Sequence, residues 1–174
     1  MFDYNSIPAA YYDKIYRRRR GMQRMWHHMK FEKFSEFPTT TRRHLDIACG
    51  PGTYLGSLED NLSIQHIGID IASHQIKYAN DLYGSSSRTF LQSSAEALPF
   101  KANSFDVVTS IELIEHLSSS NVHLILKEVF RILRPGGSLL LSTPNYRSGW
   151  VFLEPLVNIL SQVDYREQHI SRYN

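Results

Sequence analysis

Cysteine is almost absent from this chain of 174 residues, which contains a single one, Cys49. One cysteine excludes an internal disulfide framework and is typical of a protein from a reducing compartment. Long apolar runs are also missing, because the longest, residues 149–160, is interrupted by Glu154 and Pro155 and is too short to span a bilayer. Residues 1–5 lack the basic and then apolar layout of a signal peptide. We therefore expect a cytoplasmic protein without a membrane span.

A large excess of one charge is lacking too, because the formal net charge is only +2. The charge is unevenly distributed, however, since residues 1–44 hold ten Lys and Arg against four Asp and Glu, with the run Arg17–Arg20 at the centre of the excess. Such a run is most often a solvated helix face, and the alternatives are a site for an anionic substrate, nucleic acid or acidic lipid. The length suffices for one domain with a core and is short for two.

The spacing of apolar residues changes near residue 44. Before it, residues 1–37 show no β alternation and predict one or two helices, with a packing face made of Tyr11, Tyr12, Ile15 and Tyr16. After it, strands are expected at residues 44–49, 66–71, 88–92, 105–111 and 138–143. Helices are expected at residues 54–61 and 73–83, from a cap at Asn121 to the stop signal at 134–137, and at 150–162. This alternation predicts an α/β fold with a doubly wound, mostly parallel sheet.

A glycine turn follows the first expected strand. Residues 45–53 read Leu-Asp-Ile-Ala-Cys-Gly-Pro-Gly-Thr, and the second strand ends in Asp70, twenty residues after Gly50. Gly50 and Gly52 allow a ligand to approach the backbone, and an acid at this spacing can accept ribose hydroxyls. Ser94 and Ile111 also fall at carboxyl ends of strands, so four positions converge on one edge of the sheet. The pattern favours a nucleoside-cofactor site over an ordinary strand-to-helix turn.

Six short motifs follow one another at residues 45–53, 69–71, 94–100, 105–108, 114–117 and 131–137. They resemble the motifs of class I S-adenosylmethionine-dependent methyltransferases, and more narrowly the small-molecule group typified by quinone-biosynthesis enzymes. A nicotinamide-binding turn would require a third glycine where this chain has Leu55. The resemblance implies a Rossmann-like fold, with residues 1–40 as a helical cap or lid and residues 41–174 as the cofactor-binding domain. It also implies methyl transfer from S-adenosylmethionine to a small molecule, with oxygen as the expected acceptor atom.

The same resemblance implies roles for individual residues. The turn Ala48–Gly52, which includes Cys49 and Gly50, would lie against the amino-acid end of the cofactor, with Asp46 orienting the turn or the amino group. Asp70 would hold the ribose hydroxyls. The remaining contacts would be Ile71 on the adenine face, Ser94 and Ala95 at the adenine ring, and Ser110 and Ile111 at the floor. This chain departs from the family pattern in having Ala48 in place of the first glycine and Ser94 in place of a carboxylate.

A cluster of two acids and a histidine follows the fourth expected strand. Glu112, Glu115 and His116 have the spacing i, i+3, i+4, so a helical turn beginning at Glu112 would place all three on one face. The layout is similar to that of metal-dependent O-methyltransferases and small-RNA 2′-O-methyltransferases, which implies a divalent ion such as Mg²⁺ held by these three residues and His169. The alternatives are that His116 acts as a catalytic base beside the glutamates without a metal, or that the cluster has neither role.

Motifs are sparse after the fifth expected strand, where the family's sheet usually continues into a closing β-hairpin. The residues left in this chain do not provide that hairpin, so we expect a domain truncated at its C-terminus, or a sheet edge covered by another copy in a homodimer. Methylation of a small-molecule acceptor is the favoured function. The alternatives are methylation of RNA, suggested by Arg17–Arg20, and a cofactor-binding module without turnover.

Overall fold

A five-stranded sheet forms the centre of the protein, in a computed structural model that describes residues 7–36, 41–145 and 171. The strands are β1 (Arg43–Ile47), β2 (Gln65–Asp70), β3 (Arg88–Gln92), β4 (Phe105–Ile111) and β5 (Leu133–Ser142). Their order is β3-β2-β1-β4-β5, and every neighbouring pair is parallel. The carboxyl ends of β1 and β4 therefore mark the switch point at which doubly wound sheets bind ligands. The predicted α/β fold with a parallel sheet is confirmed.

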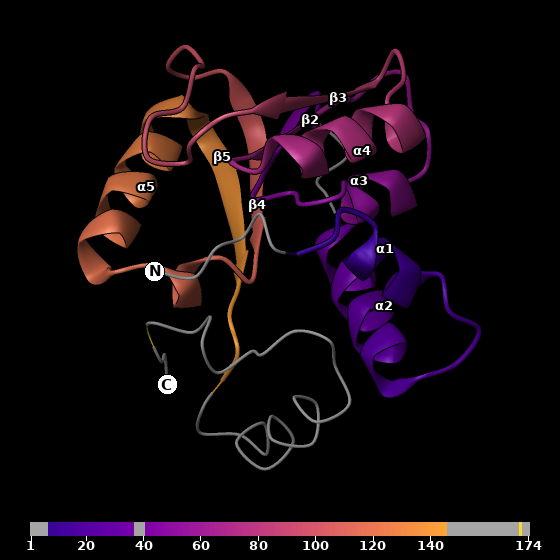
Figure 1. Ribbon diagram of the computed structural model, residues 1–174. Coiled ribbons are helices and arrows are strands. Elements are labelled where there is room, and N and C mark those ends of the chain that lie inside the picture. Colours follow the sequence, from indigo (N-terminus) through magenta and orange to yellow (C-terminus); the bar gives the residue numbers. More distant parts are fainter. Residues whose placement is uncertain (1–6, 37–40, 146–170, 172–174) are drawn as a thin grey trace.

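Helices cover both faces of this sheet (Figure 1). On one face, α5 (Ser119–Ile132) buries Ile125 and Val129 in a core cluster with Leu45 of β1. On the other face, α3 (Thr53–Ser57) and α4 (Ser73–Tyr83) surround Phe90 of β3 with apolar side chains that include Leu55. Because side chains alternate along a strand, β1 contributes apolar residues to the α5 side and polar residues to the α3 side.

Several element boundaries differ from those expected. The helix expected at residues 54–61 ends at Ser57, because Leu58 is already extended (ψ 146°). The N-cap of α5 is Ser118 rather than Asn121, since the Ser118 hydroxyl accepts the Asn121 backbone N–H at 3.3 Å. A Ser at this position satisfies one of the free N–H groups of the first turn.

The segment Arg134–Gly137 was expected to separate the last helix from the last strand, but it lies inside β5. The pairing register explains the difference, because Phe105 is opposite Leu133 whereas Val107 is opposite Ser138. The extra residues of β5 thus bulge outward opposite Asp106, whose carboxylate binds Arg134 Nη1 at 2.6 Å. A glycine-containing bulge can interrupt a ladder without ending the strand.

Two helices precede the sheet, as predicted, and lie side by side below α3 in Figure 1: α1 (Tyr11–Tyr16) and α2 (Met22–Phe34). Tyr11 and Ile15 are buried in a small cluster, and the Tyr16 ring stacks on His28 with centroids 4.2 Å apart. No helix within the described ranges is both long and apolar enough to cross a membrane. The helix expected at 150–162 lies outside the described residues.

Candidate functional site

The turn between β1 and α3 has an unusual backbone. Ala48 (φ 60°), Gly50 (φ 51°) and Gly52 (φ 74°) all lie in the left-handed region. A Cβ on Gly50 would have no described heavy atom within 4 Å, whereas a Cβ on Gly52 would meet the Phe90 ring at 2.7 Å. Gly52 is therefore required by packing, while Gly50 presents bare backbone to open space. A ligand can approach the chain closely at Gly50.

Asp70, the last residue of β2, lies against this turn. One carboxylate oxygen accepts the Gly50 N–H at 2.9 Å, and the other accepts the Ala72 N–H at 2.9 Å. Burial raises the pKa of Asp70, and the two N–H groups partly oppose that rise. The next residue, Ile71, leaves 65% of its surface exposed at the same edge. The structure thus brings together the turn, the acid and the apolar residue that the sequence pattern predicts.

The thiol of Cys49 lies beneath the turn rather than on its open side. Its pKa is raised well above its usual value by burial and by the carboxylates of Asp46 and Asp70. A buried, protonated thiol is a poor nucleophile. Cys49 therefore serves packing in this turn.

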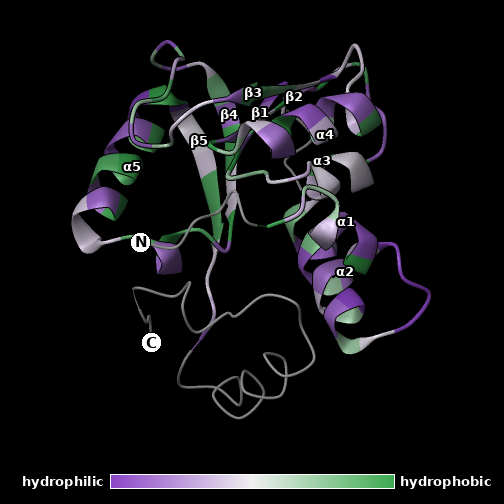
Figure 2. Ribbon diagram, in the orientation of Figure 1, coloured by the Kyte–Doolittle hydropathy of each residue, from purple (hydrophilic) through white to green (hydrophobic). Residues whose placement is uncertain are grey.

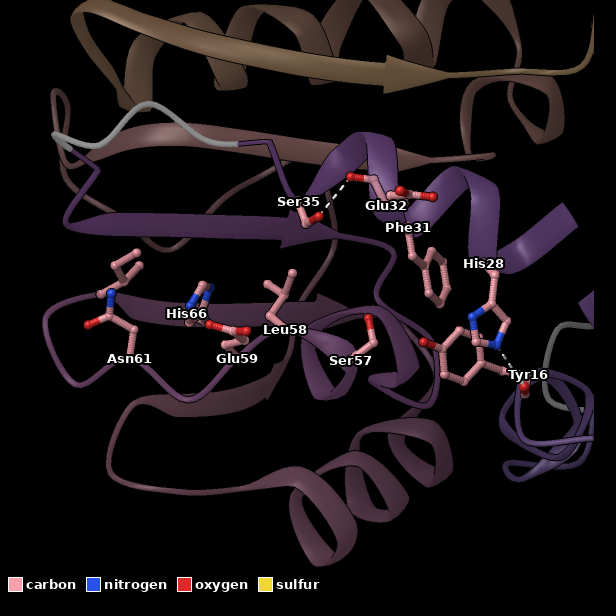
Figure 3. Close-up of a pocket in the computed structure, with 11 residues that line it drawn as sticks. Tyr16, His28, Phe31, Glu32, Ser35, Ser57, Leu58, Glu59, Asn61 and His66 are labelled. Carbon is pink, nitrogen blue, oxygen red and sulfur yellow. Dashed lines mark hydrogen bonds between the residues drawn. The ribbon is translucent and has the colours of Figure 1, made fainter. Parts of the chain in front are cut away.

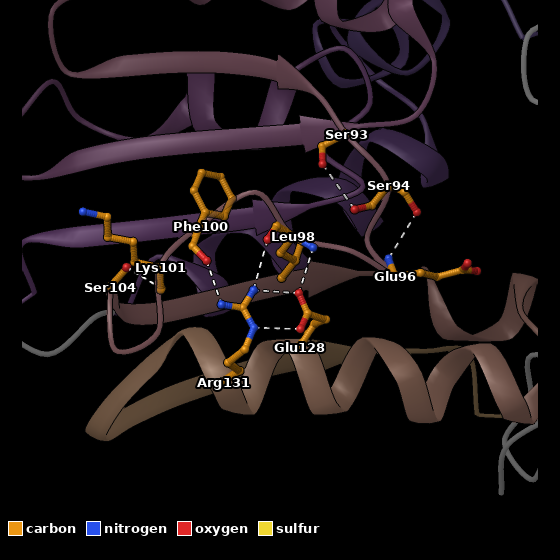
Figure 4. Close-up of polar contacts among 9 residues, drawn as sticks. All are labelled: Ser93, Ser94, Glu96, Leu98, Phe100, Lys101, Ser104, Glu128 and Arg131. Carbon is orange, nitrogen blue, oxygen red and sulfur yellow. Dashed lines mark hydrogen bonds and ion pairs between the residues drawn. The ribbon is translucent and has the colours of Figure 1, made fainter.

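The segment after β3 carries Ser94 and Ala95 and is held by α5 (Figure 4). Arg131 donates hydrogen bonds to the carbonyls of Leu98 and Phe100 at 3.0 and 2.7 Å, and it pairs with Glu128 at 2.7 Å. Glu128 in turn accepts the Leu98 N–H at 2.9 Å. The Ser94 hydroxyl accepts the Glu96 N–H at 3.2 Å, so it caps a turn within the segment. Sequence reasoning found the segment but missed this brace, whose partners are about thirty residues apart.

A buried polar chain runs across the sheet below the turn. The Thr109 hydroxyl donates to Asp46 Oδ1 at 2.6 Å, His44 Nε2 lies 2.8 Å from Thr109 Oγ1, and His44 Nδ1 lies 2.9 Å from His66 Nδ1. Because Thr109 gives its single proton to Asp46, His44 must donate through Nε2, and its Nδ1 must then accept from His66. All members are buried. The hydrogen bonds therefore run in one direction and end on Asp46.

Burial controls the protonation of this chain. It lowers the pKa of His44 well below the usual value and lowers the pKa of His66 to about 4, so both rings are neutral near pH 7. Burial also raises the pKa of Asp46 to about 7, although the Thr109 hydrogen bond opposes that rise. Neither His44 nor His66 was assigned a role from the sequence. The polar residues at positions 44 and 46, which alternate with apolar ones in a buried strand, could have indicated a buried hydrogen-bonded chain.

The acid cluster after β4 does not have the expected helical geometry. Glu112 has a φ of 55°, and the short 3₁₀ helix begins only at Ile114 (Ile114–His116), so Glu112 does not share a helical face with Glu115 and His116. Spacing alone could not reveal this, because it assumes right-handed backbone throughout. Glu112 instead binds the Lys30 ammonium at 2.7 Å and accepts a hydrogen bond from the Trp26 indole at 3.4 Å. Burial tends to raise the pKa of Glu112, but Lys30, with smaller contributions from His27 and Trp26, lowers it below its usual value.

Glu115 is fully buried and His116 is partly buried. Burial raises the pKa of Glu115 to about 7, and the nearby Thr143 hydroxyl partly opposes that rise. In the described part of the chain, neither carboxylate oxygen makes a hydrogen bond of good geometry. Ser110, at the end of β4, is also buried with an unpartnered hydroxyl there, and Ile111 packs against the α3 side. The end of β4 thus holds several polar groups that lack partners within the protein as described.

A metal ion does not fit the arrangement that the structure describes. Within residues 7–36, 41–145 and 171, no three His, Cys, Asp or Glu side chains lie close enough together to bind one. His169, the fourth expected ligand, lies outside those residues.

Helix α1 is fixed directly onto the glycine turn by a residue that sequence reasoning did not single out. The Asp13 carboxylate is buried, and it accepts hydrogen bonds from Thr53 at 3.1 Å, from Tyr78 at 3.0 Å and from Tyr83. Arg17 completes the cluster with an ion pair at 2.8 Å. Thr53 is the first residue of α3, next to Gly52, so α1 and the turn are parts of one packed unit.

A pocket of about 510 Å³ lies between α2 and the segment that joins α3 to β2 (Figure 3). Glu32 of α2, Glu59 of the connecting segment and His66 are among its lining residues. His66 is the second residue of β2, so this pocket is near the amino ends of the strands. It is distinct from the edge that carries Gly50 and Asp70.

Comparisons with known proteins agree with this geometry. A family model described as "Methyltransferase domain" matches residues 45–141. Demethylmenaquinone methyltransferase of Lactococcus lactis is 36% identical over 99 residues, covering 53% of this chain and 38% of that protein. Ubiquinone biosynthesis O-methyltransferase of Xanthomonas oryzae is 36% identical over 107 residues, covering 59% and 43%. The solved PH0226 protein of Pyrococcus horikoshii has a TM-score of 0.71 at 25% identity, covering 91% and 70%. This chain spans less than half the length of the two curated relatives.

Proposed function

Because this chain belongs to the Methyltransferase domain family, whose model matches residues 45–141, we propose that it transfers a methyl group from S-adenosylmethionine to a small-molecule acceptor. Oxygen is the proposed acceptor atom, on a hydroxylated ring of the quinone-precursor type. The names of the two relatives, which concern demethylmenaquinone and ubiquinone biosynthesis, support this choice. The observation that carries the proposal is the Asp70 carboxylate held against the open side of the glycine turn.

Asp70 is suited to binding a ribose. Each of its oxygens already accepts one backbone N–H, from Gly50 and Ala72. A carboxylate has about four acceptor positions, so about two remain for the two hydroxyls of the sugar. Because the N–H groups fix the carboxylate in advance, little reorganisation accompanies binding. Ile71, exposed beside it, supplies an apolar surface for the adenine.

Asp46 and Gly50 are the proposed contacts of the amino-acid end of the cofactor. Gly50 leaves room for close approach, and the Thr109 hydroxyl fixes the Asp46 carboxylate in one orientation. A positively charged amino group beside Asp46 would lower the pKa of this buried acid and keep it ionised. Binding of the cofactor would thus compensate for the cost of burying the Asp46 charge.

The sulfonium of the bound cofactor supplies the electrophilic methyl group. A hydroxyl acceptor that received this methyl group would give up its proton, which a nearby base must accept. We assign this proton to His116, because an imidazole is the most common general base in enzymes and this side chain is only partly buried, just after β4. Glu112 is engaged by Lys30 and keeps α2 at the end of β4.

Calorimetric titration with S-adenosylhomocysteine tests the cofactor site. Replacing Asp70 by Ala should weaken binding by about 1–3 kcal/mol, because hydrogen bonds to a charged group are lost. The matched control is Asp81→Ala on α4, which removes an exposed acid paired only with Lys77 and should leave the dissociation constant unchanged. Equal affinities for the wild type and Asp70→Ala would show that the ribose is not bound at this residue.

A further inference from the structure

The four arginines at residues 17–20 do not act as one group. Arg17 is exposed but lies against the protein surface, where it pairs with Asp13 at 2.8 Å and donates to the Tyr83 hydroxyl at 2.8 Å. Arg18, Arg19 and Arg20 are exposed in the connection between α1 and α2, and none of them forms an ion pair with a carboxylate of the described residues. Figure 2 shows this connection as a hydrophilic loop that projects from one side of the molecule. Three positive charges thus face solvent together.

Two of these arginines, Arg18 and Arg20, line a small cavity at the start of α2. Its volume is about 180 Å³, and Arg18, Arg20 and Arg24 line it together with Gly21 and Met22. The first turn of α2 contains no acidic residue. A guanidinium group binds phosphate oxygens through paired N–H donors, so three arginines around one cavity favour an anionic group there. The cavity is therefore complementary to an anionic phosphate group.

An exposed apolar face begins directly beside this cavity. Met22, Met25, Trp26 and Met29 recur at i, i+3, i+4 and i+7 on α2, and between 44% and 57% of each side chain's surface is exposed. The opposite face of α2 packs Phe31 and Phe34 against Tyr54. Helix α2 therefore has one apolar face for the core and a second one facing water. Flexible methionines and an amphipathic tryptophan are side chains that suit the boundary of a lipid bilayer.

We propose that the α1–α2 connection and the exposed face of α2 form a docking surface for an anionic membrane. The arginines would bind lipid phosphates, and the Met side chains would enter the adjacent acyl region. Trp26, whose indole N–H donates to Glu112, would lie at the boundary between the two. RNA would satisfy the arginines but leave the methionines in water. In a symmetric pair the same patch would face its own copy, and neither the α1–α2 connection nor the first turn of α2 offers an acidic residue to the arginines. A surface that combines exposed arginines with an exposed apolar helix face therefore fits an acidic lipid bilayer better than RNA or a second copy of the chain.

The docking surface lies next to the edge of the sheet that carries the proposed cofactor site. Trp26 donates its indole N–H to Glu112, directly after β4, so the docking face adjoins the carboxyl edge of the sheet. A membrane bound there would lie close to the edge where an apolar acceptor enters. This last point rests on the proposed function, whereas the docking surface itself rests only on α1 and α2.

Vesicle flotation of the full chain, without any methylation assay, tests the surface. The protein should float with vesicles of phosphatidylcholine mixed with phosphatidylglycerol, and far less with phosphatidylcholine alone. The double variant Arg18→Gln, Arg20→Gln should lower the partition coefficient about 25-fold, at about fivefold for each charge removed. The double variant Met25→Gln, Met29→Gln should lower it about tenfold, because the apolar contact is lost. In a Trp150→Phe background, where Trp26 is the remaining tryptophan, the fluorescence should shift to the blue on binding.

Lys77→Gln, Lys101→Gln is the matched control, since it removes the same charge from α4 and from the segment before β4 and should leave the partition unchanged. Asp70→Ala should also float like the wild type, so failure of the cofactor site and failure of the docking surface are distinguishable. The proposal is overturned if anionic vesicles do not retain the protein, or if the lysine control loses as much binding as the arginine variant. It is equally overturned if an RNA oligonucleotide displaces the protein from the vesicles.

Discussion

Ala48 holds a left-handed backbone conformation at the first position of the glycine turn, where φ is 60°. The sequence identified Ala48 as a departure from the pattern of the resembling family, which has a glycine there. The structure explains why the difference has an energetic cost. An L side chain in this region costs roughly 1–2 kcal/mol, because Cβ approaches the following carbonyl oxygen. The rest of the fold must therefore compensate for this unfavourable backbone conformation at Ala48.

Ala48→Gly should consequently stabilise the protein. Relief of the strain is partly offset by the greater freedom of glycine in the unfolded chain, so we expect a gain of about 1 kcal/mol in the free energy of unfolding. Urea denaturation followed by circular dichroism measures it. The control Ala79→Gly removes the same methyl group from the right-handed interior of α4 and should cost more than about 1 kcal/mol, because the packing of a fully buried methyl is lost as well. Destabilisation by both substitutions would show that residue 48 is not strained.

At the scale of elements, one buried carboxylate joins the first helix to α3 and α4. Asp13 joins α1 to the first residue of α3 through Thr53 and to α4 through Tyr78 and Tyr83. Three hydroxyls and one guanidinium therefore depend on the same buried acceptor. Because Thr53 directly follows Gly52, the hydrogen bond between Asp13 and Thr53 would transmit a displacement of α1 to the glycine turn. This coupling is consistent with the idea of residues 1–40 as a cap, which stays a prediction.

Asp13→Ala should weaken the attachment of α1. We expect a loss of about 2–3 kcal/mol in the free energy of unfolding, since buried hydroxyls are left without their charged acceptor. Hydrogen exchange should show faster exchange in residues 11–16 and 52–56, with β1 and β4 unaffected. The exposed pair Lys77–Asp81 provides the comparison, because Asp81→Ala should cost less than about 1 kcal/mol. Unchanged protection of α1 in Asp13→Ala would contradict the role given to this residue.

The sequence predicted elements better than it predicted contacts between them. Strands 88–92 and 105–111 were placed correctly because β-branched and apolar residues mark them locally. The helical face proposed for Glu112 was wrong, because a left-handed residue breaks the periodicity and because its partner Lys30 lies more than eighty residues away. Asp13, Thr109 and Arg131 were missed for the same reason. Their roles depend on tertiary contacts for which no local pattern exists.

For the molecule as a whole, buried titratable groups act on stability in opposite directions. Burial lowers the pKa of His27 and His66 to about 4, so the folded protein gains stability as the pH rises from about 4 towards the usual histidine value. Burial raises the pKa of Asp46 and Glu115 to about 7, so the folded state holds protons that the unfolded chain has lost, and stability falls as the pH rises towards 7. At mildly acidic pH, the histidines therefore increase the free energy of unfolding with rising pH, whereas the two buried acids decrease it.

Asp46→Asn separates these contributions, because asparagine imitates the protonated acid at every pH. The ordinary pKa of an aspartate is 3.8, and in the folded protein that of Asp46 is about 7. Between these values the wild type should lose about 1.4 kcal/mol per pH unit relative to the variant, and above them the difference should level off. Urea titrations at a series of pH values measure the difference directly, and Glu115→Gln should show the same trend from its own buried acid. A difference that stayed constant from acidic to neutral pH would mean that Asp46 is ionised in the folded protein throughout, and the polar chain that ends on it would then hold a permanent charge.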